Sequence, residues 1–114
     1  MVFEKLVSLL DNGQARYRVL EQAAEGKSDE VARIRGTAPG QGAKAMLCKT
    51  KSGEHWVLAV LPGDQKLDFK KLAAALGLPK MTLASPDEAT ALTGCVMGAV
   101  PPFSLTPQIA LVVD

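Results

Sequence analysis

Residues Gly36 to Lys49 read GTAPGQGAKAMLCK, a glycine-rich loop that leads directly into an extended segment. Three glycines and a proline in its first seven residues predict an irregular backbone whose N–H groups can face a ligand. Residues 43–50 predict a strand, on which side chains alternate between the two faces, so that Lys44 shares a face with Met46 and Cys48. We expect the rest of the chain to be arranged around this loop and strand.

Lys44 is the candidate functional side chain of this stretch. A lysine whose neighbours on the strand face are Met46 and Cys48 lies at the edge of an apolar surface, where an amine usually has an anionic partner. The alternative interpretation is a lysine at the strand end that extends its amine to water. These fourteen residues leave both interpretations open.

Two known glycine motifs resemble the loop and are rejected. Residues 40–45, GQGAKA, match the letters of the dinucleotide-binding fingerprint, but that motif follows a strand and opens a helix, whereas this loop precedes a strand. A Walker A motif requires lysine directly after glycine and a hydroxyl residue after the lysine. Ala43 separates Gly42 from Lys44, and Ala45 follows.

The composition is that of one globular domain in residues 1–114. Its hydrophobic content of 47% suits a packed core, and the formal net charge is only +1. Binding along a nucleic acid duplex is not expected, because it needs many phosphate contacts. The first residues lack the apolar core of a signal peptide, and no apolar run is long enough to cross a bilayer. We therefore expect a cytoplasmic protein that does not bind a membrane.

The reactive residue types are sparse. Cys48 and Cys95 are the only cysteines and form no CxxC pair, and His55 is the only histidine. This pattern predicts reduced, buried thiols, no metal site and no cofactor. It also shows no Ser-His-Asp, Cys-His or paired-carboxylate arrangement for covalent or general acid–base catalysis.

The remaining elements follow from periodicity and capping residues. Residues 3–10, 29–35, 69–76 and 86–93 predict helices, with Ser28, Asp68 and Ser85 as N-caps. Residues 16–21, 43–50, 55–61, 81–84 and 109–113 predict strands, and the second and third of these form a hairpin. The run 56–61 is apolar on both faces, which predicts a central strand. Residues 98–103 predict a stiff loop with two prolines, typical of a linker or of a pocket wall.

Short segments in a fixed order carry a resemblance to a known family. They are RGT at 35–37, GAKAML at 42–47, VLAVLP at 57–62, DFKKL at 68–72, LASPDE at 83–88, LTGC at 92–95 and GAVPPF at 98–103. Together they resemble the YbaK/prolyl-tRNA synthetase-associated editing domain family, which comprises trans-editing aminoacyl-tRNA deacylases. The similarity runs from Tyr17 onward. It implies an α/β fold of the α+β type, with a mixed, curved sheet flanked by helices.

The resemblance also implies a reaction and a site. The reaction is hydrolysis of the ester that joins a wrong, small amino acid, such as Ala, Ser, Thr or Cys, to the terminal ribose of a tRNA. The resemblance implies attack by water or by the substrate's own groups, with the help of a ribose hydroxyl and without a metal. The implied catalytic residues are Lys44 and Gly98, and the implied substrate contacts are Thr37, Ala45, Met46, Ala99, Val100, Pro101, Pro102 and Phe103. Lys44 and the loop 98–103 are expected to converge on one cavity.

Three departures from the family pattern leave alternatives open. Residues 22–24, QAA, stand where the family often has a histidine and a proline, and Ser104 stands where it commonly has glycine. The family also usually continues beyond the position of Asp114. Either a partner chain covers the edge of strand 109–113, as in a homodimer, or the pocket is less complete than in longer relatives. An aminoacyl-tRNA synthetase is a further expected partner. The alternative function is a non-catalytic module that kept the fold and binds a nucleotide, an RNA end or a protein.

Overall fold

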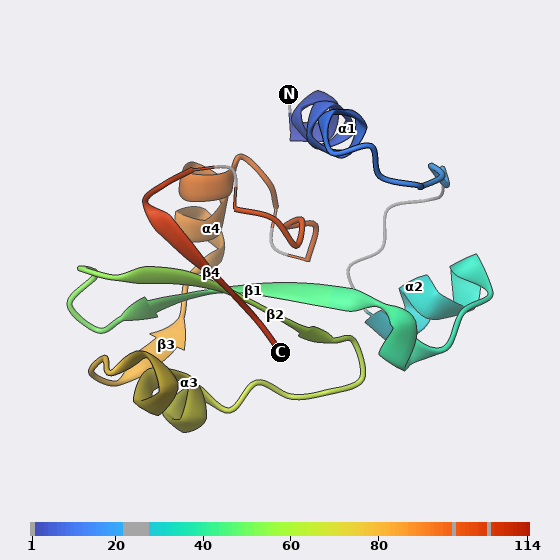
Figure 1. Cartoon of the computed structure of the whole chain (residues 1–114). Coiled ribbons are helices and arrows are strands. Elements are labelled where there is room, and N and C mark those ends of the chain that lie inside the picture. The colour runs from blue at the N-terminus through green and yellow to red at the C-terminus, as the bar shows by residue number, and fades with distance from the viewer. Residues whose placement is uncertain (1, 22–27, 97, 105) are drawn as a thin grey trace.

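A four-stranded sheet with helices on both faces forms the body of the molecule in the computed structural model, which describes residues 2–21, 28–96, 98–104 and 106–114 (Figure 1). The elements, in chain order, are α1 (Val2–Asn12), α2 (Ser28–Arg35), the 3-10 helix η1 (Pro39–Gln41), β1 (Ala43–Thr50), β2 (Trp56–Pro62), α3 (Phe69–Leu76), β3 (Met81–Leu83), α4 (Pro86–Thr93) and β4 (Ile109–Val113).

The sheet is mixed, as expected, with strand order β3-β1-β2-β4. β1 pairs antiparallel with β2, and also with β3 through its last three residues. β2 pairs in parallel with β4, so the chain crosses over from one to the other through α3, β3 and α4. Parallel pairing requires such a long connection, because the chain must return to the same end of the sheet.

β2 is the central strand that its sequence predicts. Its residues from Val57 to Leu61 are all buried. Val57 and Ala59 pack in a cluster with α3, whereas Leu58 packs in a second cluster with α4 and β4. A strand that is apolar on both faces can be buried only between two layers, and here those layers are the two helices.

The caps of α3 and α4 confirm their predicted ends. Asp68 accepts a hydrogen bond from the Lys71 N–H, and α3 ends at Gly77 with φ of 64°. Ser85 and Glu88 form a capping box at the start of α4, which ends at Gly94 with φ of 73°. Side chains thus satisfy N–H groups that a helix cannot satisfy itself.

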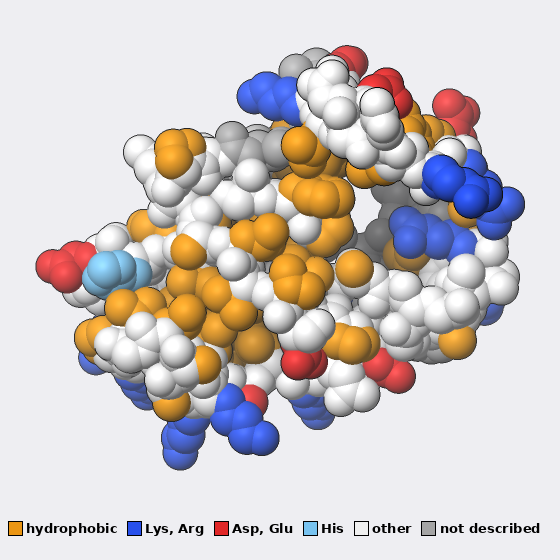
Figure 2. Space-filling model, viewed as in Figure 1, with side chains coloured by type: hydrophobic (Ala, Val, Ile, Leu, Met, Phe, Trp, Pro, Cys, Tyr) orange, Lys and Arg blue, Asp and Glu red, His pale blue; other side chains and the backbone are white. Residues whose placement is uncertain are grey.

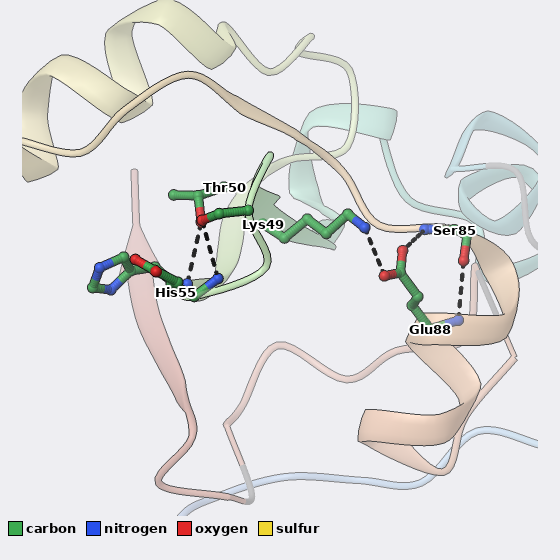
Figure 3. Close-up of polar contacts among 7 residues, drawn as sticks. Lys49, Thr50, His55, Ser85 and Glu88 are labelled. Carbon is green, nitrogen blue, oxygen red and sulfur yellow. Dashed lines mark hydrogen bonds and ion pairs between the residues drawn. The ribbon is translucent and has the colours of Figure 1, made fainter.

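An ion pair joins α4 to the hairpin of β1 and β2 (Figure 3). Lys49 Nζ donates to Glu88 Oε2 at 2.6 Å and lies 5.7 Å from the centre of the Trp56 ring. Glu88 Oε1 also accepts from the Ser85 N–H at 2.9 Å. The hydrogen bonds from Lys49 and from the Ser85 backbone lower the pKa of the Glu88 carboxyl. Its charge therefore contributes to the docking of α4 on the sheet.

We expect the stability difference between the parent and Glu88→Gln to depend on pH. Because the pKa of Glu88 is lower in the folded state, its contribution is complete above the unfolded pKa and disappears as pH falls through the folded pKa. Urea unfolding at several pH values should therefore show the parent as more stable at neutral pH, with a gap that closes in acid. Asp87→Asn is the matched control, and an equal dependence on pH in both variants would contradict this prediction.

Two local expectations were wrong. Residues 16–21 are exposed and form no strand, since no described strand pairs with them. Tyr17 instead donates its hydroxyl to Asp11 Oδ1 at 2.6 Å. The glycine-rich loop is not irregular throughout, because residues 39–41 form η1. The Gly63 N–H donates to the Gly42 carbonyl at 2.7 Å, so the loop is held against the turn that follows β2.

The N-terminal helix α1 lies on the outside of the fold (Figure 1). None of its 11 residues is buried, and the Phe3 side chain is 58% exposed. A Cβ atom placed on Gly94 would lie 3.7 Å from Val2 Cγ2, so the first turn of α1 contacts the end of α4. Among the described residues, no helix is sufficiently long and apolar to cross a bilayer.

Candidate active site

A cavity of about 150 Å³ lies between α1, α4 and the loop that leads to β4. Leu58 of β2 and Ile109 of β4, both buried, contribute to it from the sheet. The other described residues that line it are Val2, Lys5, Leu92, Thr93, Val100, Pro101, Phe103, Ser104 and Thr106. In Figure 2, hydrophobic side chains gather between α1 and α3, and Lys and Arg side chains lie at the margins of this area. Seven of the described residues that line the cavity are apolar, and four carry a polar side chain, so the cavity combines apolar surface with polar groups, as small-molecule sites do.

Ser104 fastens the cavity wall to the last strand. Its Oγ lies 2.8 Å from the Thr106 carbonyl oxygen and 2.7 Å from the Ile109 carbonyl oxygen. A hydroxyl has one proton, so it donates to one of these carbonyls at a time. At this position the family pattern leads us to expect glycine. This chain instead has a side chain that connects the diproline loop, residues 98–103, to β4.

Removing this hydroxyl should loosen the loop. We expect Ser104→Ala to lower the free energy of unfolding by about 1 kcal/mol, the usual contribution of one hydrogen bond. Urea unfolding measures the change. Ser8→Ala, at an exposed site on α1, is the control and should change stability by less than about 0.5 kcal/mol. Equal stability of Ser104→Ala and the parent would show that the bond contributes nothing.

The predicted residues of the diproline loop divide into two groups. Val100, Pro101 and Phe103 line the cavity, while Gly98, Ala99 and Pro102 belong to the same loop but not to the lining. The Ala99 N–H is already bonded to the Val96 carbonyl at 3.0 Å. Gly98 has φ of 92°, a conformation that favours glycine, and its N–H forms no hydrogen bond with another described residue.

The predicted residues of β1 and the glycine-rich loop are not among those that line the cavity. They are Thr37, Lys44, Ala45 and Met46. Lys44 is half-buried opposite Leu61. On its face of β1, Met46 and Cys48 pack with α3, whereas Ala45 and Leu47 pack with α4 and Val100 on the other face. Strand alternation therefore puts Lys44 on the α3 face and the diproline loop on the α4 face.

Two N–H groups of the glycine-rich loop are occupied. Ala38 donates to Gln41 Oε1 at 2.7 Å, and the Gln41 N–H donates back to the Ala38 carbonyl at 3.0 Å. Both donors are used in hydrogen bonds between Ala38 and Gln41 around η1, so they do not face a ligand. Thr37 is exposed, and its N–H bonds the Ala32 carbonyl at the end of α2.

Lys5 is a candidate residue that the sequence analysis missed. It is exposed in the first turn of α1, and it is the only charged residue among the described residues that line the cavity. The amphipathic pattern of α1 indicates a helix that packs on something. It does not indicate which part of the fold the helix covers, so the sequence carries no signal for this lysine.

The two thiols differ in environment. Cys48 is fully buried, and this burial raises the pKa of its thiol to about 11, so it stays protonated near neutral pH. Cys95 was also expected to be buried but is only half-buried, next to Thr93, whose hydroxyl accepts from the Cys95 N–H at 3.1 Å. In the described part of the chain, no three His, Cys, Asp or Glu side chains are grouped to hold a metal ion.

Comparison with known proteins identifies the family. Residues 6–114 match the model of the aminoacyl-tRNA editing domain. The chain is 48% identical over 113 residues to the multifunctional Ser/Thr-tRNA deacylase ProXp-y of Escherichia coli (strain K12), a match that covers 97% of this chain and 68% of that protein. It is 34% identical over 85 residues to a proline–tRNA ligase of Pelobacter propionicus, covering 75% of this chain and 15% of the ligase.

The fold comparison agrees. The crystal structure of the hypothetical protein APE2540 superposes with a TM-score of 0.86 at 29% identity, covering 96% of this chain and 73% of that one. The family model matches nearly the whole chain, and the mixed sheet agrees with the solved structure. The chain belongs to the aminoacyl-tRNA editing domain family.

Proposed function

We propose that this chain is an aminoacyl-tRNA deacylase that hydrolyses, in trans, the ester of a tRNA carrying a wrong, small amino acid. The observation that carries the proposal is the cavity walled by Val100, Pro101 and Phe103, in a chain 48% identical to a Ser/Thr-tRNA deacylase. Serine and threonine are the first substrates to test, followed by alanine and cysteine. We place the reaction in the cytoplasm, where charged tRNA is made.

The size of the cavity supports a small amino acid. A cavity of about 150 Å³ lined by Leu, Ile and Phe side chains is large enough for benzene. This cavity has the same volume of about 150 Å³. The side chains of alanine, serine, threonine and cysteine have fewer heavy atoms than benzene, so they fit with room for part of the ester. Selection between them rests on small differences, because one methylene in an apolar pocket is worth only about 1–3 kcal/mol.

The proposed chemistry uses water and backbone donors. Water attacks the ester carbonyl carbon, the bond to the ribose oxygen breaks, and that oxygen takes a proton to become a free hydroxyl. The Gly98 N–H forms no hydrogen bond with a described residue. It is the proposed donor to the oxyanion that forms on the carbonyl oxygen. The reaction needs no metal ion in this proposal, so the rate should be unchanged by a chelator.

Lys44 is the proposed group that orients the RNA end. It lies near the start of β1, while β3 pairs only with Cys48–Thr50, so no described strand covers the β1 edge beside it. A flexible four-carbon side chain can carry its amine around such an edge toward the α4 face. There it would act as a point charge against a phosphate and orient the adenosine.

The proposal is tested with a panel of tRNAs charged with alanine, serine, threonine and cysteine. We expect the parent to release amino acid from at least one mischarged tRNA and to spare the correctly charged one. No release from any member of the panel would reject the deacylase. Saturable binding of a non-hydrolysable aminoacyl-adenosine without turnover would then favour the second candidate, a binding module, which the position of Lys44 outside the cavity lining also supports.

Two partners complete the proposal. The edge strand β4 is apolar, with Leu111 43% and Val113 65% exposed, and it can pair with the same strand of a second copy. A monomeric mass in light scattering at high micromolar concentration would reject this homodimer. Similarity to part of a proline–tRNA ligase suggests a synthetase as the second partner, which co-purification with that enzyme would test.

A further inference from the structure

The cavity has a single charged group in its wall. Lys5 lies among seven apolar residues and the hydroxyl-bearing residues Thr93, Ser104 and Thr106. Its helix α1 is the first element of the chain and lies far in sequence from the other elements that form the cavity. Tertiary packing therefore brings this amine to the site. A lone cation beside an apolar hollow is suited to a ligand with an apolar part and an anionic part.

We propose that Lys5 is a phosphate-binding residue, whose amine binds the phosphate of the terminal nucleotide when the aminoacyl group fills the cavity. This inference rests on the proposed function and extends it. It assigns a second cation to the RNA end, from an element that lies far from Lys44 in the sequence.

Two of the three hydroxyls of the cavity are poorly placed for this role. Thr93 Oγ1 donates to the Ala89 carbonyl at 2.6 Å, and Ser104 Oγ is engaged by the carbonyls of Thr106 and Ile109. A hydroxyl whose proton is already donated cannot also donate it to a phosphate. Lys5 forms no ion pair with another described residue, so its amine is available.

The chemistry of the substrate selects the phosphate as the partner of Lys5. Near the ester, an aminoacylated RNA end has ribose hydroxyls and one anionic phosphate for each nucleotide. It also has a cationic α-ammonium group, which repels the amine of a lysine. With a formal net charge of only +1, the chain attracts RNA through local cations. The Lys5 side chain is exposed, so it need not lose all its water before it binds.

The first test is the salt dependence of the reaction. Lys5→Gln should raise KM for the charged tRNA several-fold, and the slope of log(kcat/KM) against log[salt] should become shallower by about 0.7, the value for one phosphate contact on a single strand. Lys5→Arg should restore both. Lys70→Gln is the matched control, because Lys70 is also exposed in the first turn of a helix, on α3 at the other face of the sheet.

The second test removes the phosphate from the substrate instead of the amine from the protein. Serine esterified to the ribose of adenosine 5′-monophosphate and serine esterified to the ribose of adenosine differ by the 5′-phosphate alone. The parent and Lys70→Gln should prefer the ester with the phosphate, and Lys5→Gln should lose most of this preference, since only Lys44 then remains to bind a phosphate. If Lys5→Gln keeps the full preference, or if Lys70→Gln loses it as well, the assignment of Lys5 is wrong.

A failure of this inference is distinct from a failure of the proposed function. If the parent hydrolyses no ester, the deacylase is rejected, and binding is then titrated by calorimetry with the seryl amides of 3′-amino-adenosine, with and without the 5′-phosphate. A phosphate preference that Lys5→Gln abolishes supports the role of Lys5 even without turnover. Equal binding of both amides by the parent overturns it.

Discussion

Gly98→Ala is expected to lower the deacylation rate constant by about a hundredfold or more, with little change in stability. Gly98 has φ of 92°, and an alanine there is strained by about 1–3 kcal/mol, which the loop relieves by rotating its backbone. The N–H that we assign to the oxyanion then points elsewhere, and the loss of one such donor costs about 10²–10³ in rate. Single-turnover deacylation, which isolates the chemical step, measures the effect.

Gly53→Ala is the matched control for Gly98→Ala. Gly53 has φ of 77° and open space around it, but it lies in the turn between β1 and β2. The same strain should appear there as a loss of stability of about 1 kcal/mol, with the deacylation rate retained. If the two variants lose activity equally, the effect on rate comes from stability, and the role of Gly98 as a donor is rejected.

Lys44→Ala is expected to lower kcat/KM by roughly a hundredfold, the usual cost of losing a group that orients substrate and supplies charge. Lys44→Arg keeps the charge on a side chain of different shape and should restore part of the activity. The measurement is deacylation of the panel member that the parent hydrolyses fastest. Lys51→Ala, at an exposed site at the end of the same strand, is the control.

Full activity in Lys44→Ala would favour the simpler interpretation of this residue. Lys44 is then a lysine at a strand end that covers apolar surface with its stem and extends its amine to water. Its half-buried position and its face of β1, shared with Met46 and Cys48, are compatible with that interpretation. In that case Lys5 remains the only proposed cation of the RNA-binding site.

Local hydrogen bonding made much of the fold predictable. The caps at Asp68 and Ser85 and the glycine at position 77 each act within one helical turn, so the residue types alone indicate where the helices begin and end. The hairpin of β1 and β2 is also local, because a short turn sets its register. These features depend on residues that are close in sequence.

Features that depend on distant partners were predicted less well. Residues 16–21 alternate as a strand does, but a strand forms only when another strand pairs with it, and none does in the described part of the chain. Alternation correctly gave Lys44 the same face as Met46 and Cys48. It could not indicate which face the diproline loop would cover, because that depends on how α4 and β4 pack.

The same limit applies to the site. Val100, Pro101 and Phe103 were expected to wall a pocket, and they line the cavity. Lys5 was not expected there, because the position of α1 depends on contacts such as that between Val2 and Gly94, which are far apart in the sequence. A resemblance to a family points to residues within its shared segments, and Lys5 lies before the first of them.

The parallel pairing of β4 with β2 has a consequence for synthesis on the ribosome. Ile109, which β4 contributes to the cavity, lies opposite Trp56, and the Asp114 N–H bonds the Val60 carbonyl at 2.9 Å. Translation delivers the N-terminal residues first, so the hairpin, α3 and α4 can emerge from the exit tunnel while these last residues are still inside it. A nascent chain therefore folds the hairpin, α3 and α4 before the diproline loop and β4 complete its cavity, and it can correct a charging error only after its own synthesis has passed residue 113.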